Sequence, residues 1–185
     1  MPRFSLRTLW LILAAILFAY TSASAQQAQL IKLSKDDQKL YDVAFDKVVA
    51  LFEKFEIYLK DNKTKEAIEE LESIVAVDFP AGSEGMDGVL LQIEGHIYLG
   101  EMYIEQSDAT KNDKTKNDLL NKAVAVLKTG IKKAPDVDER TYDLYMALGH
   151  AYKALGKKED ALSAFEQAEK IMKKLEDKQK KSKNG

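Results

Sequence analysis

Apolar residues recur every three or four positions in six segments after residue 34, and this spacing constrains the fold most strongly. In the first segment, the apolar positions between Leu40 and Leu59 follow this period, as one face of an α-helix requires. The other segments cover about 65–77, 87–106, 118–133, 139–155 and 157 onward. Strands would need a period of two, which the chain hardly offers. The sequence therefore predicts an all-α protein.

Residues with special backbone preferences lie between these segments. Ser34 followed by Asp37 is similar to a capping box and indicates the start of the first helix. Pro135 ends the fourth segment, and Gly156 is placed to end the fifth in a left-handed conformation. The segment from Ser107 to Asn117 is almost entirely polar, so we expect a solvated loop there.

The last two segments carry a pattern of large and small residues at fixed spacing. Gly149 and Ala161 are small where two helices of a hairpin would approach most closely, and larger residues fill the space around that contact. The predicted packing residues of this pair are Tyr145, Leu148, Gly149, Tyr152, Ala161, Phe165 and Ala168.

The same pattern recurs in the two preceding pairs of segments. In the middle pair it consists of His96, Leu99, Gly100, Tyr103, Ala123, Leu127, Gly130 and Pro135. Here the small residues of the two helices are 23 positions apart, against 12 in the last pair, so eleven residues are inserted between them. The first pair is degenerate, because Phe55 stands where the others have glycine.

This pattern resembles the tetratricopeptide repeat, a helix–turn–helix of about 34 residues. The repeats would span about 48–81 (degenerate), 93–136 (with the inserted loop 107–117) and 142–175. The resemblance implies an all-α helix–turn–helix solenoid of about three repeats, stacked in a right-handed superhelix. A generic six-helix bundle is the alternative fold.

The resemblance further implies that the first helices line a concave groove that binds a partner. Residues on those helices that avoid the packing face would point into it: Phe52, Glu56, Glu94, Ile97, Glu101, Ile104, Glu105, Asp143, Met146, His150 and Lys153. Apolar residues between acids suit an amphipathic helix or extended segment with basic flanks. The alternative is that Phe52, Ile97 and Ile104 pack between neighbouring repeats.

The first 25 residues have the three parts of an export signal. Arg3 and Arg7 precede an apolar stretch from Leu9 to Tyr20, and small residues follow at Ala23 and Ala25. The apolar stretch is shorter than the roughly 20 residues of a membrane-spanning helix, although a retained anchor is the alternative. We expect cleavage after residue 25 and an exported protein, periplasmic if the source is a Gram-negative bacterium and otherwise secreted.

Charge is distributed unevenly along the chain. The total of 28 Lys and Arg against 30 Asp and Glu argues against a nucleic-acid partner. Residues 173–185, however, contain six Lys and two acids, which favours either weak contact with an anionic membrane or polymer, or a frayed, solubilising helix end. The predicted organisation is a signal peptide (1–25), a flexible mature N-terminus (26–34), the repeat domain (35–175) and a Lys-rich tail (176–185).

Catalytic and metal-binding patterns are scarce. Without Cys, the chain has no disulfide, thiolate metal ligand or cysteine nucleophile. His96 occupies a packing position of the repeat, and His150 with Asp143 would give too few ligands for zinc. We therefore predict no metal and no cofactor.

These observations favour a non-catalytic protein–protein interaction or assembly module of the cell envelope that binds a partner peptide or helix. The alternative is a self-associating envelope adaptor that contacts anionic membrane or polymer through its basic tail. A homodimer is expected, because so short an array leaves a terminal face exposed. An envelope hydrolase is less favoured, because the sequence lacks a constellation of catalytic residues.

Overall fold

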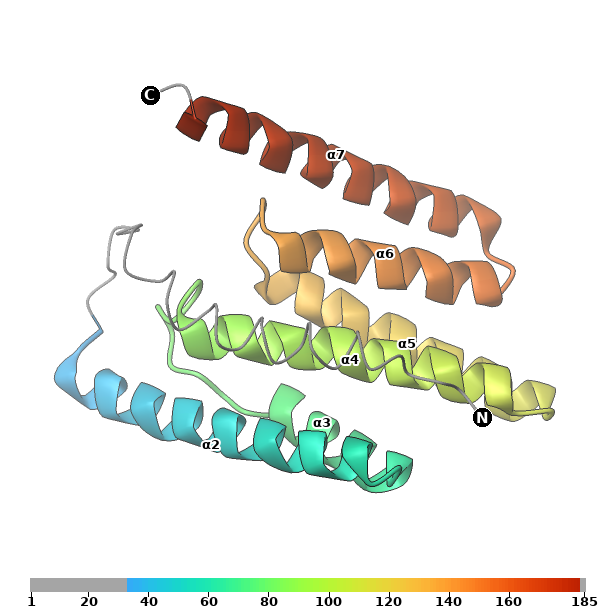
Figure 1. Cartoon of the computed structure of the whole chain (residues 1–185), viewed down its shortest axis with the longest axis horizontal. Coiled ribbons are helices and arrows are strands. Elements are labelled where there is room, and N and C mark those ends of the chain that lie inside the picture. The colour runs from blue at the N-terminus through green and yellow to red at the C-terminus, as the bar shows by residue number, and fades with distance from the viewer. Residues whose placement is uncertain (1–32, 184–185) are drawn as a thin grey trace. The chain divides into compact units, whose positions relative to one another are not determined.

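The computed structural model describes residues 33–183, which form six α-helices and no strand. The helices are α2 (Lys35–Lys60), α3 (Thr64–Val75), α4 (Asp87–Ala109), α5 (Asp113–Lys133), α6 (Glu139–Ala154) and α7 (Lys158–Lys183) (Figure 1). None of these helices is long and apolar enough to cross a membrane. The predicted export signal and most of the predicted flexible N-terminus lie outside the described residues.

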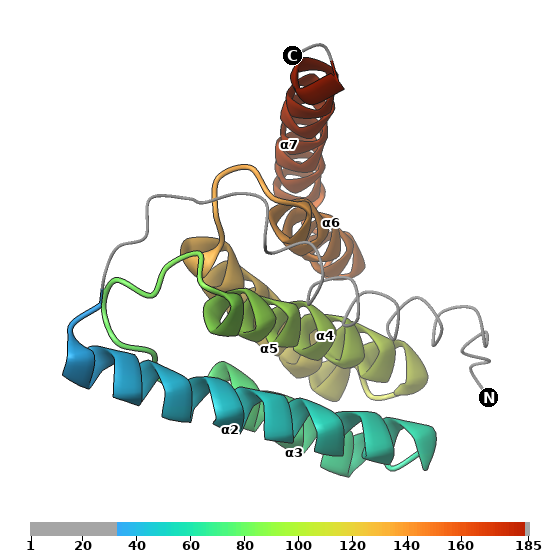
Figure 2. The ribbon, with the colours of Figure 1, turned by 60° about the vertical axis from the view of Figure 1, so that its left-hand side comes forward.

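Successive helices pack in pairs within this region. α2 packs on α3, α4 on α5 and α6 on α7, and each pair contacts the next one along the chain (Figures 1 and 2). The first and last pairs do not touch each other. Contacts restricted to neighbouring pairs are the defining property of a helical-repeat solenoid. The prediction of an all-α helical-repeat fold is confirmed.

Two helix boundaries lie where the sequence places them. The Ser34 hydroxyl accepts a hydrogen bond from the Asp37 amide at 3.1 Å and donates one to the Asp37 carboxylate at 2.6 Å. This satisfies one of the free amides at the start of α2. Gly156 has a φ of 74°, which lets the chain turn sharply between α6 and α7.

Glycine allows the helices of the two later pairs to come into close contact. A Cβ atom added to Gly149 would lie 2.4 Å from the nearest ring atom of Phe165 on α7. A Cβ atom added to Gly100 would lie 2.6 Å from the Leu127 side chain on α5. In each of these two hairpins, a large side chain of the second helix therefore packs directly on the glycine backbone of the first helix.

The structure buries most of the predicted packing residues of the two later pairs. Twelve of the fifteen are buried, namely His96, Leu99, Gly100, Tyr103, Ala123, Leu127, Gly130, Leu148, Gly149, Tyr152, Ala161 and Ala168. Pro135, Tyr145 and Phe165 are half-buried.

The predicted loop at 107–117 is wrong. Ser107 is buried within α4, where its hydroxyl donates a hydrogen bond to the Ile104 carbonyl at 2.6 Å. Asn112 caps α5, because its side-chain oxygen accepts a hydrogen bond from the Thr115 amide at 2.9 Å. Most of the eleven inserted residues therefore lengthen the two helices, and only 110–112 connect them.

The predicted tail also differs from the structure. α7 continues through the lysine-rich segment to Lys183 instead of fading after residue 175. Lysine favours helix, and no Gly or Pro interrupts this segment before residue 184. A lysine-rich sequence can therefore extend a helix that packing has already started.

One fully buried polar side chain ties three helices together. The Gln92 amide nitrogen on α4 donates hydrogen bonds to the Ile74 and Val77 carbonyls, at 3.0 and 2.6 Å, where α3 ends. The Lys133 ammonium group on α5 donates to the Gln92 side-chain oxygen at 2.7 Å. These bonds satisfy carbonyls that the end of α3 leaves without helical partners. The sequence pattern assigned no role to Gln92.

Candidate binding groove

A hollow of about 360 Å³ lies between α4 and α6, and four carboxylates surround it. Its lining consists of Glu101, Ile104, Glu105, Asp108, Asp143, Met146, Ala147 and His150, a set that we call the acidic groove. Six of the eleven predicted groove residues belong to it. Asp108 and Ala147 complete the lining and were not among them.

The two helices contribute to the acidic groove with the same spacing. α4 supplies four residues from Glu101 to Asp108, and α6 supplies four from Asp143 to His150, each at steps of three, one and three positions. This spacing places the four residues of each helix on one face. α4 and α6 are the first helices of neighbouring pairs and contact each other directly. The pairing of repeats therefore forms the groove.

The charge of the acidic groove is not balanced by cations. No ion pair within residues 33–182 involves any of its four carboxylates. Glu101 is exposed, but it lies in a concave surface, and desolvation there followed by repulsion from Asp143 raises its pKa. Desolvation also raises the pKa of Asp143, with Glu139 and Asp138 adding to the effect. The groove therefore favours a cationic ligand.

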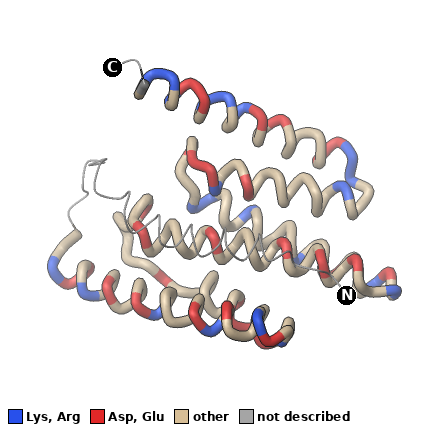
Figure 3. Tube along the Cα trace, viewed as in Figure 1, with Lys and Arg blue, Asp and Glu red and all other residues tan. Residues whose placement is uncertain are grey.

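Tyr98 lies on α4 among the same acids. Burial raises its pKa to about 12, and the negative charges of Glu94 and Glu101 contribute next. Its ring stacks on Phe55 of α2, with the ring centroids 5.8 Å apart. The Tyr98 hydroxyl group is therefore protonated at neutral pH and surrounded by negative potential. Figure 3 shows the acidic residues spaced along α2 and α4.

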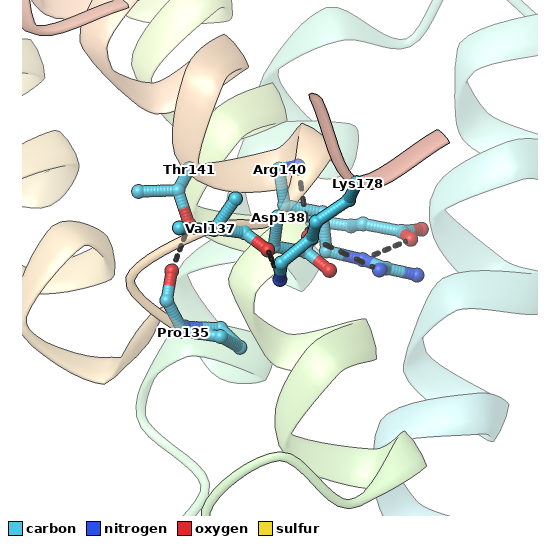
Figure 4. Close-up of polar contacts among 7 residues, drawn as sticks. Pro135, Val137, Asp138, Arg140, Thr141 and Lys178 are labelled. Carbon is cyan, nitrogen blue, oxygen red and sulfur yellow. Dashed lines mark hydrogen bonds and ion pairs between the residues drawn. The ribbon is translucent and has the colours of Figure 1, made fainter. Parts of the chain in front are cut away.

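Arg140 neutralises one of the predicted groove acids. Its Nε donates to the Glu94 carboxylate at 2.8 Å, and its Nη1 donates to Asp138 at 3.4 Å (Figure 4). Burial raises the pKa of Glu94, and the charge of Arg140 opposes that rise. Glu94 therefore joins α4 to the start of α6 instead of lining the hollow. Arg140 is the only arginine after residue 7, and the repeat pattern assigned it no role.

Two of the predicted apolar contacts are unavailable to a partner. Phe52 is only 6% exposed and Ile97 only 8%, so the expectation that they line an open groove is wrong. The ring of Phe52 meets Phe55 and Tyr98 edge-on, with centroids 6.1 and 6.4 Å apart, where α2 packs against α4. The alternative interpretation, packing between repeats, holds for Phe52, and Ile97 is buried in the hydrophobic core. Ile104 is half-exposed in the hollow.

The remaining two predicted groove residues lie outside the hollow. Glu56 on α2 pairs with Lys60, with 3.7 Å between the charged groups. Lys153 is exposed near the end of α6. Neither residue belongs to the lining of the acidic groove.

The two histidines have different environments. His96 is 2% exposed and packs against Gly130 of α5, and burial followed by the charge of Lys133 lowers its pKa to about 4. It is therefore a neutral core residue at physiological pH. His150 is exposed in the acidic groove, with its ring edge-on to Phe165 at 5.4 Å. In the part of the chain that the structure describes, no three His, Asp or Glu side chains converge as a metal site requires.

No protein-family model matches the chain, and no curated protein matches it. Among solved structures, the chain is similar to the crystal structure of MamA, with 18% sequence identity and a TM-score of 0.30. The match covers 76% of this chain and 87% of that one. A TM-score of 0.30 is too low to support an argument, so the helical-repeat assignment rests on the packing of successive helices in the pairs α2 with α3, α4 with α5 and α6 with α7.

Proposed function

We propose that the protein is a non-catalytic binding module that holds a basic segment of a protein partner in the acidic groove. The observation that carries the proposal is the set of four carboxylates, which form no ion pair within residues 33–182, around an apolar floor of Ile104, Met146 and Ala147. An amphipathic helix could place apolar side chains on this floor and Lys or Arg beside the carboxylates. Repeat solenoids use such concave surfaces for binding.

The groove offers little that would support catalysis. His150 is the only imidazole in it, and within residues 33–182 no hydrogen bond joins His150 to a carboxylate. A catalytic histidine is usually oriented by such a partner. These observations favour binding over an envelope hydrolase.

Peptide titration tests the proposal. A fluorescent Lys-rich amphipathic peptide and its Glu-rich counterpart would be added to the protein and to a groove variant, Glu101→Lys with Asp143→Lys. The matched control is Asp46→Lys with Glu53→Lys, which changes the same charges on the exposed face of α2. We expect the basic peptide to bind the unmodified protein and the control variant with similar affinity. It should bind the groove variant about tenfold more weakly. Equal binding to all three proteins would contradict the proposal.

We also propose that the protein is exported to the cell envelope, on the strength of the signal pattern in residues 1–25. Expression in a bacterial host followed by intact-mass analysis tests this. The expected mass is that of a chain beginning at Gln26. Recovery of the full-length chain in the cytosol would rule the proposal out.

A second candidate function is contact with an anionic surface through α7. Lys173, Lys174 and Lys178 are exposed on an ordered helix, and each Lys near an anionic membrane contributes about 1 kcal/mol before salt screening. The full chain and a variant ending at Leu175 would be compared in sedimentation with phosphatidylserine vesicles. Equal retention of the two would eliminate this function.

A further inference from the structure

The lysine-rich end of α7 extends past its partner helix. α7 has 26 residues and α6 has 16, and the two run antiparallel, so the end of α7 projects beyond the start of α6 (Figure 1). The Lys178 ammonium group donates a hydrogen bond to the Val137 carbonyl, in the turn before α6, at 3.4 Å (Figure 4). The residues that follow Lys178 therefore lie beyond α6.

Lysines outnumber acids on this end, because residues 173–185 contain six Lys against Glu176 and Asp177. Lys173, Lys174, Lys178, Lys180 and Lys181 are all exposed. Among the described side chains, none of these lysines takes part in an ion pair. The described part of the chain thus carries two surfaces of opposite charge, and no ion pair within residues 33–182 involves the carboxylates of one or these lysines of the other.

The charges on the two surfaces have the same spacing. Lys174, Lys178 and Lys181 are separated by four and then three residues, and Glu101, Glu105 and Asp108 are separated in the same way. With a rise of about 1.5 Å per residue, both rows have steps of about 6 and 4.5 Å. Two such helices lying side by side in parallel would bring all three opposite pairs together.

The lysine-rich end cannot reach the acidic groove of its own molecule. It leaves the body of the protein at the N-terminal end of α6, beside Val137. The acidic groove follows α6 in the opposite direction, from Asp143 to His150, and α4 toward Asp108. Because α7 is a continuous helix, its end points away from the groove. An intramolecular contact is therefore ruled out by direction.

We propose that the lysine-rich end of α7 docks into the acidic groove of a second copy of this chain. The inference rests on the proposed function of the groove and names its occupant. The two copies use different surfaces, so the contact is heterologous and leaves one groove and one lysine-rich end free for further copies. Assembly is then head to tail, into a ring or a filament.

Analytical ultracentrifugation with charge-reversed variants tests this inference. The tail variant carries Lys174→Glu, Lys178→Glu and Lys181→Glu, and the groove variant carries Glu101→Lys, Glu105→Lys and Asp108→Lys. We expect the unmodified protein to associate as its concentration rises at about 0.05 M salt and to dissociate at about 0.5 M. Each variant alone should associate more weakly by about tenfold or more. An equimolar mixture of the two should regain association, because each tail then meets a groove of opposite charge.

The matched control replaces three exposed lysines of α2, Lys35, Lys39 and Lys47, with glutamate. It should associate as the unmodified protein does. Circular dichroism melting of every variant establishes that it is folded, and failure of the mixed variants to regain association would overturn the inference.

Two further outcomes would overturn the inference. The first leaves the acidic groove as a binding site for another partner, and the second assigns the lysine-rich end of α7 a different role. If the protein stays monomeric at low salt yet binds the basic peptide, the proposed function stands and the second copy is not the occupant. If it stays monomeric and the tail variant alone loses binding to phosphatidylserine vesicles, α7 serves a membrane surface instead.

Discussion

The buried side chain of Gln92 connects two neighbouring repeats through hydrogen bonds. It accepts a hydrogen bond from Lys133 and donates to carbonyls at the end of α3, so two repeats share one set of hydrogen bonds. A buried polar group contributes to stability only while its partners are satisfied. The periodicity of apolar residues does not single out Gln92, and it does not show which backbone groups this side chain would meet.

Replacing Gln92 with leucine is expected to destabilise the protein by about 1–3 kcal/mol, because the carbonyls and the Lys133 ammonium group lose their buried partner. Urea unfolding followed by circular dichroism measures the change. Gln38→Leu, on the exposed face of α2, is the control and should change stability by less than about 0.5 kcal/mol. Similar effects for both variants would contradict a structural role for Gln92.

Gly149 and Phe165 give a second test at the scale of single residues. Gly149→Ala should destabilise by about 1–3 kcal/mol, because the new Cβ would lie 2.4 Å from the Phe165 ring. Combining it with Phe165→Leu makes a double-mutant cycle. We expect the double variant to lose less free energy of unfolding than the sum of the losses in the two single variants. Additive costs would mean that the glycine is not required by this contact.

At the scale of elements, the insertion between α4 and α5 shows how a polar segment can be helical. Its charged residues lack an apolar period, which is why the sequence favours a loop. In the structure, side-chain hydrogen bonds stabilise the helix ends on both sides of the connection. Ser107 donates to the Ile104 carbonyl, and Asn112 caps α5. Both helices are already packed as a pair, so extending each by a turn has little nucleation cost.

The cap at Asn112 can be tested directly. Asn112→Ala should lower stability by about 1 kcal/mol, because the Thr115 amide loses its acceptor. Amide hydrogen exchange should speed up in the first turn of α5 while the rest of the helix stays protected. Asn121→Ala, exposed in the middle of α5, is the control and should leave that turn unchanged.

At the scale of the whole molecule, separation of charge dominates. Residues 26–172 carry 20 basic and 28 acidic residues, whereas residues 173–185 carry a net charge of +4. The fold separates these charges in space, because α4 and α6 gather carboxylates around the acidic groove while α7 carries lysines beyond the start of α6 (Figure 3). The near-neutral total conceals two surfaces that could bind each other.

The gathered carboxylates predict how stability depends on pH. The pKa values of Glu94, Glu101 and Asp143 are raised in the folded state, so between the unfolded and folded pKa values the folded state binds more protons. Stability should therefore rise as the pH falls through the raised pKa values, until other carboxylates begin to protonate. Thermal melts across pH measure this, and Glu101→Gln should flatten the rise. A melting temperature that falls steadily from neutral pH downward would contradict the prediction.

The same protonation should weaken binding of a basic peptide. Glu101 and Asp143 lose their charge at a higher pH than ordinary carboxyl groups, so affinity should begin to fall above the pH range in which exposed acids titrate. Peptide titrations at several pH values measure this loss. If affinity falls only in the ordinary range of exposed carboxyl groups, the groove acids are not the ones in contact with the peptide.

The sequence by itself determined the six helices, their pairing and the small residues that let the two later pairs close. These features depend on local periodicity and on contacts within a hairpin, where the partners are close in sequence. Tertiary structure alone decided which side chains of the first helix of each pair remain exposed to a binding partner. Ile97 and Ile104 are seven positions apart on one face of α4, yet Ile97 is buried and Ile104 lies in the hollow. The approach of α2 to α4 buries Phe52. Arg140 likewise neutralises Glu94 only because α6 packs beside α4. Such outcomes depend on how separate repeats dock, which is a long-range property that no local pattern encodes.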